Sequence, residues 1–343
     1  MTWPLQKDPP VDRRIFSFLQ YFLSVFSFLG TLCIGIEMEA RNALTKEWLT
    51  YHIKLEEDGR KIESIMRHSL GLSRRMRQKS ARNDAFTLNG KKAYLGTRVR
   101  AGDTLKIRLH LEEEGHLAAV AMDLEIAYED DDVIVLNKPP GLEVHPPEQK
   151  AAFRPTLAHG VAYYFEQIGL QSKVRPLHRL DKDTSGLVLF TKSAYAHHAL
   201  DRQLQEGLLK RSYQTLVLGV PSPLEGTIDE PIGRHPSHPL RRQVTADGEK
   251  AITHYKVLQV LDSDLSLVAV TLDTGRTHQI RVHFSYLGMP VLGDALYGGQ
   301  TMRMNRQALH ATSLQWLQPR TKEPVEVQVE LPNDIQALLT TRT

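Results

Sequence analysis

The sequence of 343 residues predicts an α+β protein, in which a small N-terminal module precedes a larger domain built on a mixed, mostly antiparallel central β-sheet flanked by helices. Three observations carry this prediction. The length corresponds to two domains of about 150 residues each. From residue 126 onward, short apolar segments bounded by turn residues outnumber helical patterns. The charge also changes sign abruptly near residue 112, which marks a domain boundary.

The composition narrows the class of protein. Hydrophobic residues make up 41% and charged residues 24% of the chain, which is typical of folded globular proteins and excludes general disorder. The single cysteine excludes an intramolecular disulfide framework and any metal site built from several thiolates. We therefore expect a protein of a reducing compartment, the cytoplasm.

The first 37 residues differ from the rest of the chain. Residues 15–36 carry no formal charge, follow Arg13 and Arg14, and contain five of the ten phenylalanines. This length and these flanks fit a membrane-spanning helix with its basic side inside. Two alternatives remain open: a hydrophobic helix on a membrane surface, or an over-long assignment of the start, since Met38 opens an ordinary soluble-type sequence.

A strongly basic segment follows. Residues 60–82 contain eight lysines and arginines against one acidic residue. Apolar residues recur there at helical spacing, at Ile62, Ile65, Met66 and Leu70. This spacing predicts a short helix and a successor, while residues 86–92 are typical of a strand, an Asn-Gly turn and a strand, and residues 99–107 of a turn and a further strand. Charge of one sign on a compact fold favours nucleic-acid contact over an ordinary solvated helix face.

Three segments of this module are characteristic: Leu-Ser-Arg-Arg at 72–75, Leu-Asn-Gly-Lys at 88–91 and Val-Arg-Ala-Gly-Asp at 99–103. With them, roughly residues 55–111 resemble the S-four RNA-binding domain found in a small-subunit ribosomal protein and in several RNA-modifying enzymes. The resemblance implies an RNA-binding domain over residues 38–113, with Arg74 and Arg75 among its RNA contacts. The acidic stretch 114–125 that follows is predicted to be a linker.

The larger domain, over residues 126–333, contains a polar cluster placed ahead of an apolar strand. A strand at 133–137 enters the rigid turn at 138–141, and residues 156–169 have helical spacing. The cluster at 175–186 then precedes the apolar residues 187–190. A polar loop held by a buried strand is a common way to position catalytic groups. The last ten residues, 334–343, are predicted to be a tail.

Several functions are open to the polar cluster when it is considered alone. A nucleophile elbow at Ser185 fails, because Gly-x-Ser-x-Gly is absent. A metal site of His178, Asp181 and Asp183 needs more converging ligands than the loop offers. Asp181 and Asp183 as a paired acid and base for glycoside cleavage is unfavourable, because side chains two apart point away from each other on an extended backbone. Asp181 can also be a simple turn or capping residue.

Two further clusters are ambiguous when each is taken alone. Residues 272–283 contain a turn glycine and then apolar residues in alternation, which predicts a strand, with Arg276 and Arg281 as phosphate contacts or ion-pair partners. On such a strand His278 and His283 fall on opposite faces, which argues against shared metal ligation. Tyr213 lies in the predicted strand 210–219, where a lone tyrosine usually serves packing.

Taken together, these segments form an ordered set. The set consists of Lys138-Pro139-Pro140-Gly141 with His145-Pro146, the run 178–186, Tyr213 with Gly219, residues 226–228, Arg234-His235-Pro236, residues 251–255, the run 275–281, and Gly293-Asp294 with Leu296-Tyr297-Gly298. In this order and spacing, residues 126–332 resemble the RluA/RluD-type pseudouridine synthases. The run His-Arg-Leu-Asp-x-x-Thr-Ser-Gly is highly specific to that family.

The resemblance implies an isomerase that detaches uracil from its ribose and rejoins it through carbon-5, in structured RNA, with ribosomal RNA as the expected substrate. It implies no cofactor and no metal, because nothing is oxidised or hydrolysed, and we expect a monomer. The alternative is a non-catalytic RNA-binding or ribosome-assembly protein that kept the fold.

The resemblance also implies roles for individual residues. Asp181 is the catalytic carboxylate, either as a nucleophile that attacks the sugar or as a base that removes a sugar proton on the way to a glycal. Arg276 is its ion-pair partner, and Tyr213 stacks on the extruded uracil. Arg179 helps to fill the space that the flipped nucleotide vacates. Three further residues are expected to contact RNA or to support the site, namely Lys138, His178 and Arg281.

Overall fold

The computed structural model describes residues 47–111, 113, 117–146, 153–262 and 264–340. The hydrophobic stretch 15–36, and the whole predicted extension 1–37, lie outside these residues. Within the described ranges, no helix combines the length and the apolar character needed to cross a membrane.

The N-terminal module has the helices and the hairpin that the sequence predicts. Its elements are β1 (Trp48–His52), η1 (Leu55–Glu57), α2 (Ile62–Ser64), η2 (Ile65–Ser69), α3 (Arg74–Arg82), β2 (Phe86–Leu88), β3 (Lys91–Lys92) and β4 (Thr104–Arg108). The strands form one sheet in the order β1-β4-β2-β3. Asn89 and Gly90 turn the hairpin with positive φ at both residues, as Asn-Gly turns do. Ile62, Ile65 and Met66 are fully buried, so the predicted helical spacing is confirmed.

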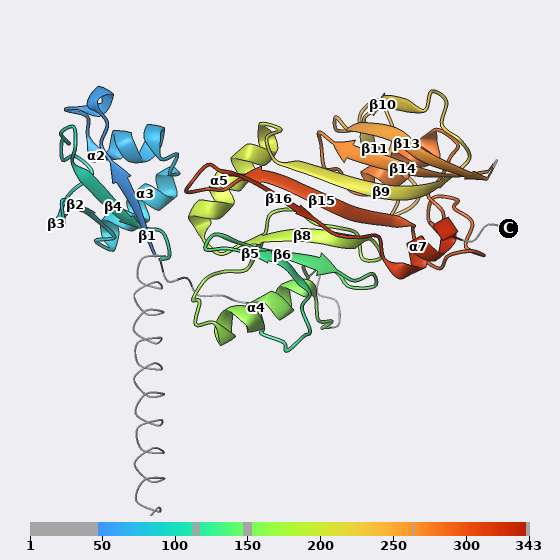
Figure 1. The fold of residues 1–343 in the computed structure, drawn as a ribbon, viewed down its shortest axis with the longest axis horizontal. Coiled ribbons are helices and arrows are strands. Elements are labelled where there is room, and N and C mark those ends of the chain that lie inside the picture. Colours follow the sequence, from blue (N-terminus) through green and yellow to red (C-terminus); the bar gives the residue numbers. More distant parts are fainter. Residues whose placement is uncertain (1–46, 112, 114–116, 147–152, 263, 341–343) are drawn as a thin grey trace, which may run out of the picture. The chain divides into compact units, whose positions relative to one another are not determined.

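The larger domain contains the remaining elements (Figure 1). They are β5 (Ile126–Glu129), β6 (Val133–Lys138), α4 (Leu157–Gln167), β7 (Arg175–Pro176), β8 (Ser185–Thr191), α5 (Ala194–Gln205), β9 (Lys210–Leu218), β10 (Glu225–Asp229), β11 (Ile232–Arg234), β12 (Arg242–Val244), β13 (Ile252–Asp262), β14 (Leu265–Leu272), α6 (Gln279–Tyr286), β15 (Leu309–Leu317), β16 (Pro324–Gln328) and α7 (Asn333–Thr340).

The central sheet confirms the predicted class. It has ten strands, eight of them in the order β10-β13-β14-β9-β15-β8-β6-β5, with β16 beside β15 and β7 beside β8. Among the strand pairs that the described residues form in this sheet, β15 and β8 are parallel and the others are antiparallel. Strands β6 and β8 are apolar on both faces because alternate residues enter two separate cores, one with α4 and one with α5.

Two local predictions about the larger domain were wrong. The run after Gly275 forms helix α6 rather than a strand. The helix is buried on nearly every side, with Ile280, Val282 and Phe284 inside, and its polar residues Gln279 and Arg281 are buried too. Because nearly all of the helix is buried, its sequence lacks the polar stripe with a period of about 3.6 residues that marks a surface helix, and the alternation of Ile280, Val282 and Phe284 with polar residues resembles a strand.

The second wrong prediction is the C-terminal tail, which is mostly a helix. Most of residues 334–343 belong to α7, whose Ile335 is fully buried in the main core. Leu338 and Leu339 pack beside it. Because these apolar residues repeat at i, i+3 and i+4, they form the buried face of a helix, which we did not recognise in the sequence.

A small separate core joins α6 to the two-stranded hairpin of β11 and β12. Ile232, Ala251, Val282 and Tyr297 are buried together there, with Val244 and Leu296 packed against them. The hairpin pairs in antiparallel register, Gly233 opposite Gln243.

Candidate active site

Asp181 lies in the loop between β7 and β8, and the strand that follows fixes this loop. At Gly186 the backbone has φ +109, and an added Cβ would lie 2.3 Å from the carbonyl oxygen of Ala311 in β15. Only glycine allows the parallel strands to approach this closely. The backbone N–H of Thr184 donates to the carbonyl of Asp181 at 3.1 Å, and its buried hydroxyl accepts from Gln307 at 3.1 Å. The polar loop is therefore held by a buried strand, as predicted.

Lys138 anchors the same loop from the end of β6. Its side chain is 1% exposed, and Nζ donates to the carbonyls of Pro139, Leu142 and Lys182 at 2.8, 2.9 and 2.8 Å. Burial lowers the pKa of Lys138 to about 7, while the charge of Asp183 opposes that shift. With all three donors used inside the protein, Lys138 supports the loop. Of the two roles expected for Lys138, RNA contact or support of the site, these contacts favour support.

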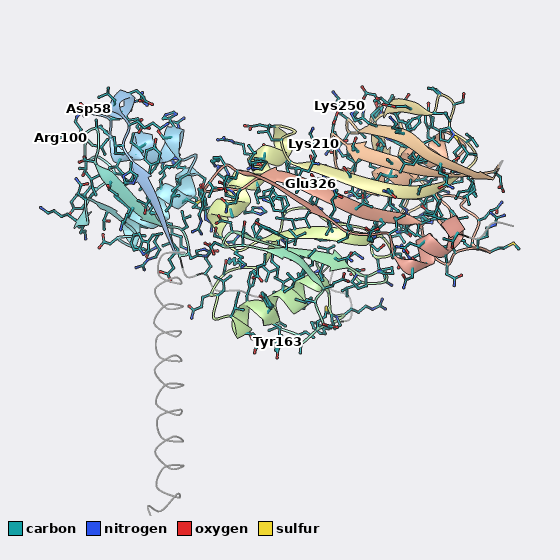
Figure 2. The ribbon with its side chains drawn as sticks, viewed as in Figure 1. Asp58, Arg100, Tyr163, Lys210, Lys250 and Glu326 are labelled. Carbon is teal, nitrogen blue, oxygen red and sulfur yellow. The ribbon has the colours of Figure 1, made fainter. Side chains whose placement is uncertain are left out.

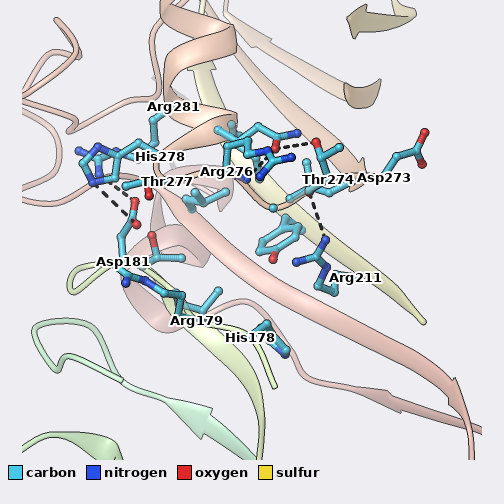
Figure 3. Close-up of a pocket in the computed structure, with 18 of the residues that line it drawn as sticks. His178, Arg179, Asp181, Arg211, Asp273, Thr274, Arg276, Thr277, His278 and Arg281 are labelled. Carbon is cyan, nitrogen blue, oxygen red and sulfur yellow. Dashed lines mark hydrogen bonds and ion pairs between the residues drawn. The ribbon is translucent and has the colours of Figure 1, made fainter. Parts of the chain in front are cut away.

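Two side chains from the α6 region face the carboxylate of Asp181 (Figure 3). Arg281 donates from Nη1 to Asp181 Oδ2 at 2.8 Å, and Nε2 of His278 lies 3.8 Å from Oδ1. Arg281 also grips the buried Asp294 with Nε and Nη2, at 2.6 and 2.8 Å. Burial alone would lower the pKa of Arg281, but the bonds to Asp294 and the charge of Asp181 outweigh burial and raise it.

The predicted pair of Arg276 and Asp181 is therefore wrong. Arg276 forms an ion pair with Glu249, and its Nε donates to the carbonyl of Lys250 at 3.0 Å. Lys250, labelled in Figure 2, lies two residues before the start of β13. The reason is the helix: α6 places residue 281 rather than 276 over Asp181. Arg281, which we expected to contact RNA or support the site, is 6% exposed and fully engaged with two carboxylates.

Asp181 opens into a pocket of about 390 Å³. Tyr213, Arg179 and His178 line it, so the structure brings these predicted residues together with Asp181, Arg276 and Arg281. Tyr213 projects from the centre of β9 and is 5% exposed; burial raises its pKa, and the charge of Arg211 opposes that shift. Arg179 is exposed at the pocket edge.

His178 belongs to the protein interior rather than to an RNA-contacting surface. Burial lowers its pKa to about 3, so its ring is neutral, and its Nε2 accepts from the backbone of Leu189 at 3.4 Å. We therefore place His178 among the supports.

Sequence reasoning assigned no role to three residues of this site: His278, Asp294 and Tyr297. The hydroxyl of Tyr297 lies 2.9 Å from Nδ1 of His278, and its ring lies 5.0 Å from the Arg281 guanidinium carbon. A charged residue in the otherwise apolar stretch 291–296 was the available signal for Asp294. Arg74 and Arg75 lie in the N-terminal module, exposed in the first turn of α3.

The site combines a carboxylate, bound by a guanidinium group, with an aromatic side chain that lines the same pocket, an arrangement typical of an enzyme. Comparison with known proteins identifies its chemistry. The RNA pseudouridylate synthase family matches residues 132–286. The uncharacterized RNA pseudouridine synthase YhcT of Bacillus subtilis is 39% identical over 290 residues, which are 84% of this chain and 95% of that protein.

More distant relatives agree. Ribosomal large subunit pseudouridine synthase D of Xanthomonas campestris is 36% identical over 268 residues, covering 74% of this chain and 79% of that protein. The structure of human RNA Pseudouridylate Synthase Domain Containing 1 matches with a TM-score of 0.50 and 28% identity, over 64% of this chain and 96% of that one. The chain belongs to the RNA pseudouridine synthases, in the RluA/RluD-type group. It is thus an isomerase, and no observation supports the non-catalytic alternative.

Proposed function

We propose that this enzyme converts specific uridines to pseudouridine in structured ribosomal RNA, with Asp181 as the nucleophile. The single observation that carries the proposal is the carboxylate of Asp181, held at 2.8 Å by Arg281 within a pocket that also contains Tyr213. The relative named as a ribosomal large subunit synthase supports ribosomal RNA as the substrate class.

The proposed reaction balances without a cofactor. One oxygen of Asp181 bonds to C1′ of the ribose while the bond from C1′ to N1 of uracil breaks, and the electron pair of that bond stays on uracil. After the base turns, C5 bonds to C1′ and displaces the carboxylate. C5 then loses its proton and N1 gains one, so the product is an isomer of the substrate. Arg281 keeps the carboxylate oriented through these steps.

The target nucleotide must leave its base stack to reach Asp181, which costs a few kcal/mol. Tyr213 offers an aromatic face in the pocket, and base–aromatic stacking contributes about 1–3 kcal/mol. Its hydroxyl makes no hydrogen bond within the part of the chain that the structure describes, so it is free to act near C5. Arg179, exposed at the pocket edge, is in a position to fill the vacated space in the RNA.

Replacing Tyr213 by phenylalanine is expected to preserve stacking and RNA affinity but to slow the loss of the C5 proton. Proton transfer by a positioned side chain contributes about a hundredfold or more, so the rate of tritium release from C5-labelled uridine RNA should fall by about that factor. Tyr213→Leu, which also removes the ring, should weaken RNA binding in addition. An unchanged rate in Tyr213→Phe would rule out a role for the hydroxyl.

We also propose that the N-terminal module binds RNA through its basic surface. Arg74 and Arg75 occupy the first turn of α3, where the helix dipole disfavours cations. The described residues offer neither of them an ion-pair partner. Cations that interact unfavourably with the helix dipole and have no compensating ion pair are typical of residues kept for binding.

The double substitution Arg74→Ala/Arg75→Ala tests this proposal. Each lost phosphate contact removes about 0.7–0.9 from the slope of log K against log salt concentration, so the slope should become shallower by about 1.5. Stability should not fall, because these cations oppose the helix dipole. As a control, Arg202→Ala/Lys256→Ala removes two exposed cations that pair with Glu206 and Glu225. Equal slopes for wild type and the Arg74/Arg75 variant would exclude the module from phosphate binding.

A further inference from the structure

His278 lies between the catalytic loop and a buried tyrosine. It is the N-cap of α6 and adopts a left-handed backbone conformation with φ +59, which is uncommon for a residue other than glycine. This conformation directs one ring nitrogen to Tyr297 and the other to Asp181, at 2.9 and 3.8 Å. Backbone strain that is maintained beside a reacting group is typical of functional positions.

The hydrogen bonds around Tyr297 determine which nitrogen of His278 carries the proton. The backbone N–H of Arg242 donates to the Tyr297 hydroxyl at 2.8 Å, so that oxygen is already an acceptor. Among the described residues, the remaining partner for the hydroxyl proton is Nδ1 of His278. If Nδ1 carried a proton instead, the hydroxyl proton of the 4%-exposed Tyr297 would be buried without an acceptor, which is costly.

We propose that Tyr297 fixes His278 in the neutral form protonated at Nε2, and that this N–H orients the carboxylate of Asp181 for attack. His278 and Tyr297 are thus positioning residues, and the inference rests on Asp181 being the nucleophile. Arg281 donates a hydrogen bond to Oδ2 at 2.8 Å, whereas Nε2 of His278 lies 3.8 Å from Oδ1, so its N–H acts on that oxygen through its dipole rather than through a hydrogen bond. Burial lowers the pKa of His278, against the opposing charge of Asp181, which agrees with a neutral ring.

The contacts of Tyr297 also reach the hairpin of β11 and β12. Arg242 begins β12, and Arg241 beside it places its guanidinium carbon 5.5 Å from the centre of the Tyr297 ring. Its Nε is buried without a hydrogen-bond partner among the described residues. The position of the hairpin therefore places the backbone N–H of Arg242 against the Tyr297 oxygen, which leaves the hydroxyl proton for Nδ1 of His278.

Four variants test the proposal: Tyr297→Phe, His278→Asn, His278→Gln, and the double variant Tyr297→Phe/His278→Gln. Phenylalanine removes only the hydroxyl. Asparagine tolerates the left-handed backbone but reaches only as far as Nδ1, whereas the amide of glutamine reaches the position of Nε2 and donates without needing a tautomer. The assay is single-turnover tritium release from total RNA of a strain lacking the enzyme, labelled at uridine C5.

Tyr297→Phe and His278→Asn should each lower the rate about tenfold to a hundredfold, with the RNA dissociation constant unchanged. His278→Gln should retain most of the rate, and Tyr297→Phe should have little further effect in the glutamine background. Additive losses in that background, or a wild-type rate for His278→Asn, would overturn the proposal. Tyr195→Phe is the matched control: this tyrosine is also 4% exposed, and its hydroxyl donates to the Pro319 carbonyl at 2.9 Å.

A measurement without turnover complements the kinetics. In protein labelled with ¹⁵N-histidine, the His278 ring, assigned by its loss in His278→Gln, should show a proton on Nε2 and none on Nδ1. A proton on Nδ1 would contradict the proposal even if the rates behaved as expected. Asp181→Asn distinguishes failure of the proposed function from failure of the positioning role of His278. If that variant stays active, the proposed function fails. If it is inactive while His278→Asn keeps the wild-type rate, only the positioning role fails.

Discussion

Replacing Asp181 by asparagine is expected to abolish uridine isomerisation while RNA affinity stays nearly intact. The amide has the same shape but cannot bond to C1′ as a carboxylate does, so the rate should fall by at least about a thousandfold, the scale of losing a catalytic nucleophile. Affinity should persist, since it comes from phosphate contacts and stacking elsewhere. Tritium release from C5-labelled RNA measures the rate, and filter binding measures the affinity.

Asp183→Asn provides the matched control, because it makes the same chemical change in the same loop. In Asp183 it is the backbone carbonyl that bonds to Arg306, at 3.1 Å, and this bond survives the substitution. We expect Asp183→Asn to isomerise uridine at close to the wild-type rate. Similar losses in the two variants would show that general loop damage, rather than loss of the nucleophile, explains the effect at Asp181.

Arg281→Met is expected to have the largest effect on stability and to remove activity as well. The arginine side chain is 7% exposed and the Asp294 side chain 1%, so the substitution strands a buried carboxylate. Breaking such a pair on one side costs about 3–5 kcal/mol, which urea unfolding can measure. The double variant Arg281→Met/Asp294→Leu should recover much of that stability, because it removes both charges, yet it should stay inactive because Asp181 has lost its guanidinium partner.

Arg276→Met separates this effect from the loss of any arginine near the pocket. Arg276 is 40% exposed and its partner Glu249 is 70% exposed, and such surface pairs contribute less than about 1 kcal/mol. If Arg276→Met destabilised the protein as strongly as Arg281→Met, the assignment of Arg281 as the partner of Asp181 would be untenable.

The comparison of these two arginines shows how far sequence reasoning reaches. The loop of Asp181 was predictable, because a polar cluster ahead of an apolar strand is visible in the sequence itself. The partner was not, because α6 is buried all round and its apolar residues alternate as in a strand. Because residues 279–286 form a helix, Arg281 rather than Arg276 lies beside Asp181. No local sequence pattern indicates this pairing.

Burial explains the other differences at the site. A lysine or a histidine in a polar turn is normally expected at the surface, so Lys138 and His178 were predicted to contact RNA or to support the site. Both are buried, and one of the three carbonyls that bind Lys138, that of Lys182, comes from a segment 44 residues further along the chain. Contacts between segments far apart in sequence are set by tertiary packing, which composition and spacing do not encode.

The small core beneath the hairpin of β11 and β12 limits how this enzyme can be re-engineered. Ile232 of the hairpin is packed with Val282 of α6 and with Tyr297, and the hairpin backbone at Arg242 bonds to the tyrosine hydroxyl. A hairpin taken from a relative must therefore be accompanied by matching residues at positions 282 and 297. Without those matching residues, the new hairpin would pack poorly against Val282 and Tyr297 and would disturb the hydrogen bond at the Tyr297 hydroxyl.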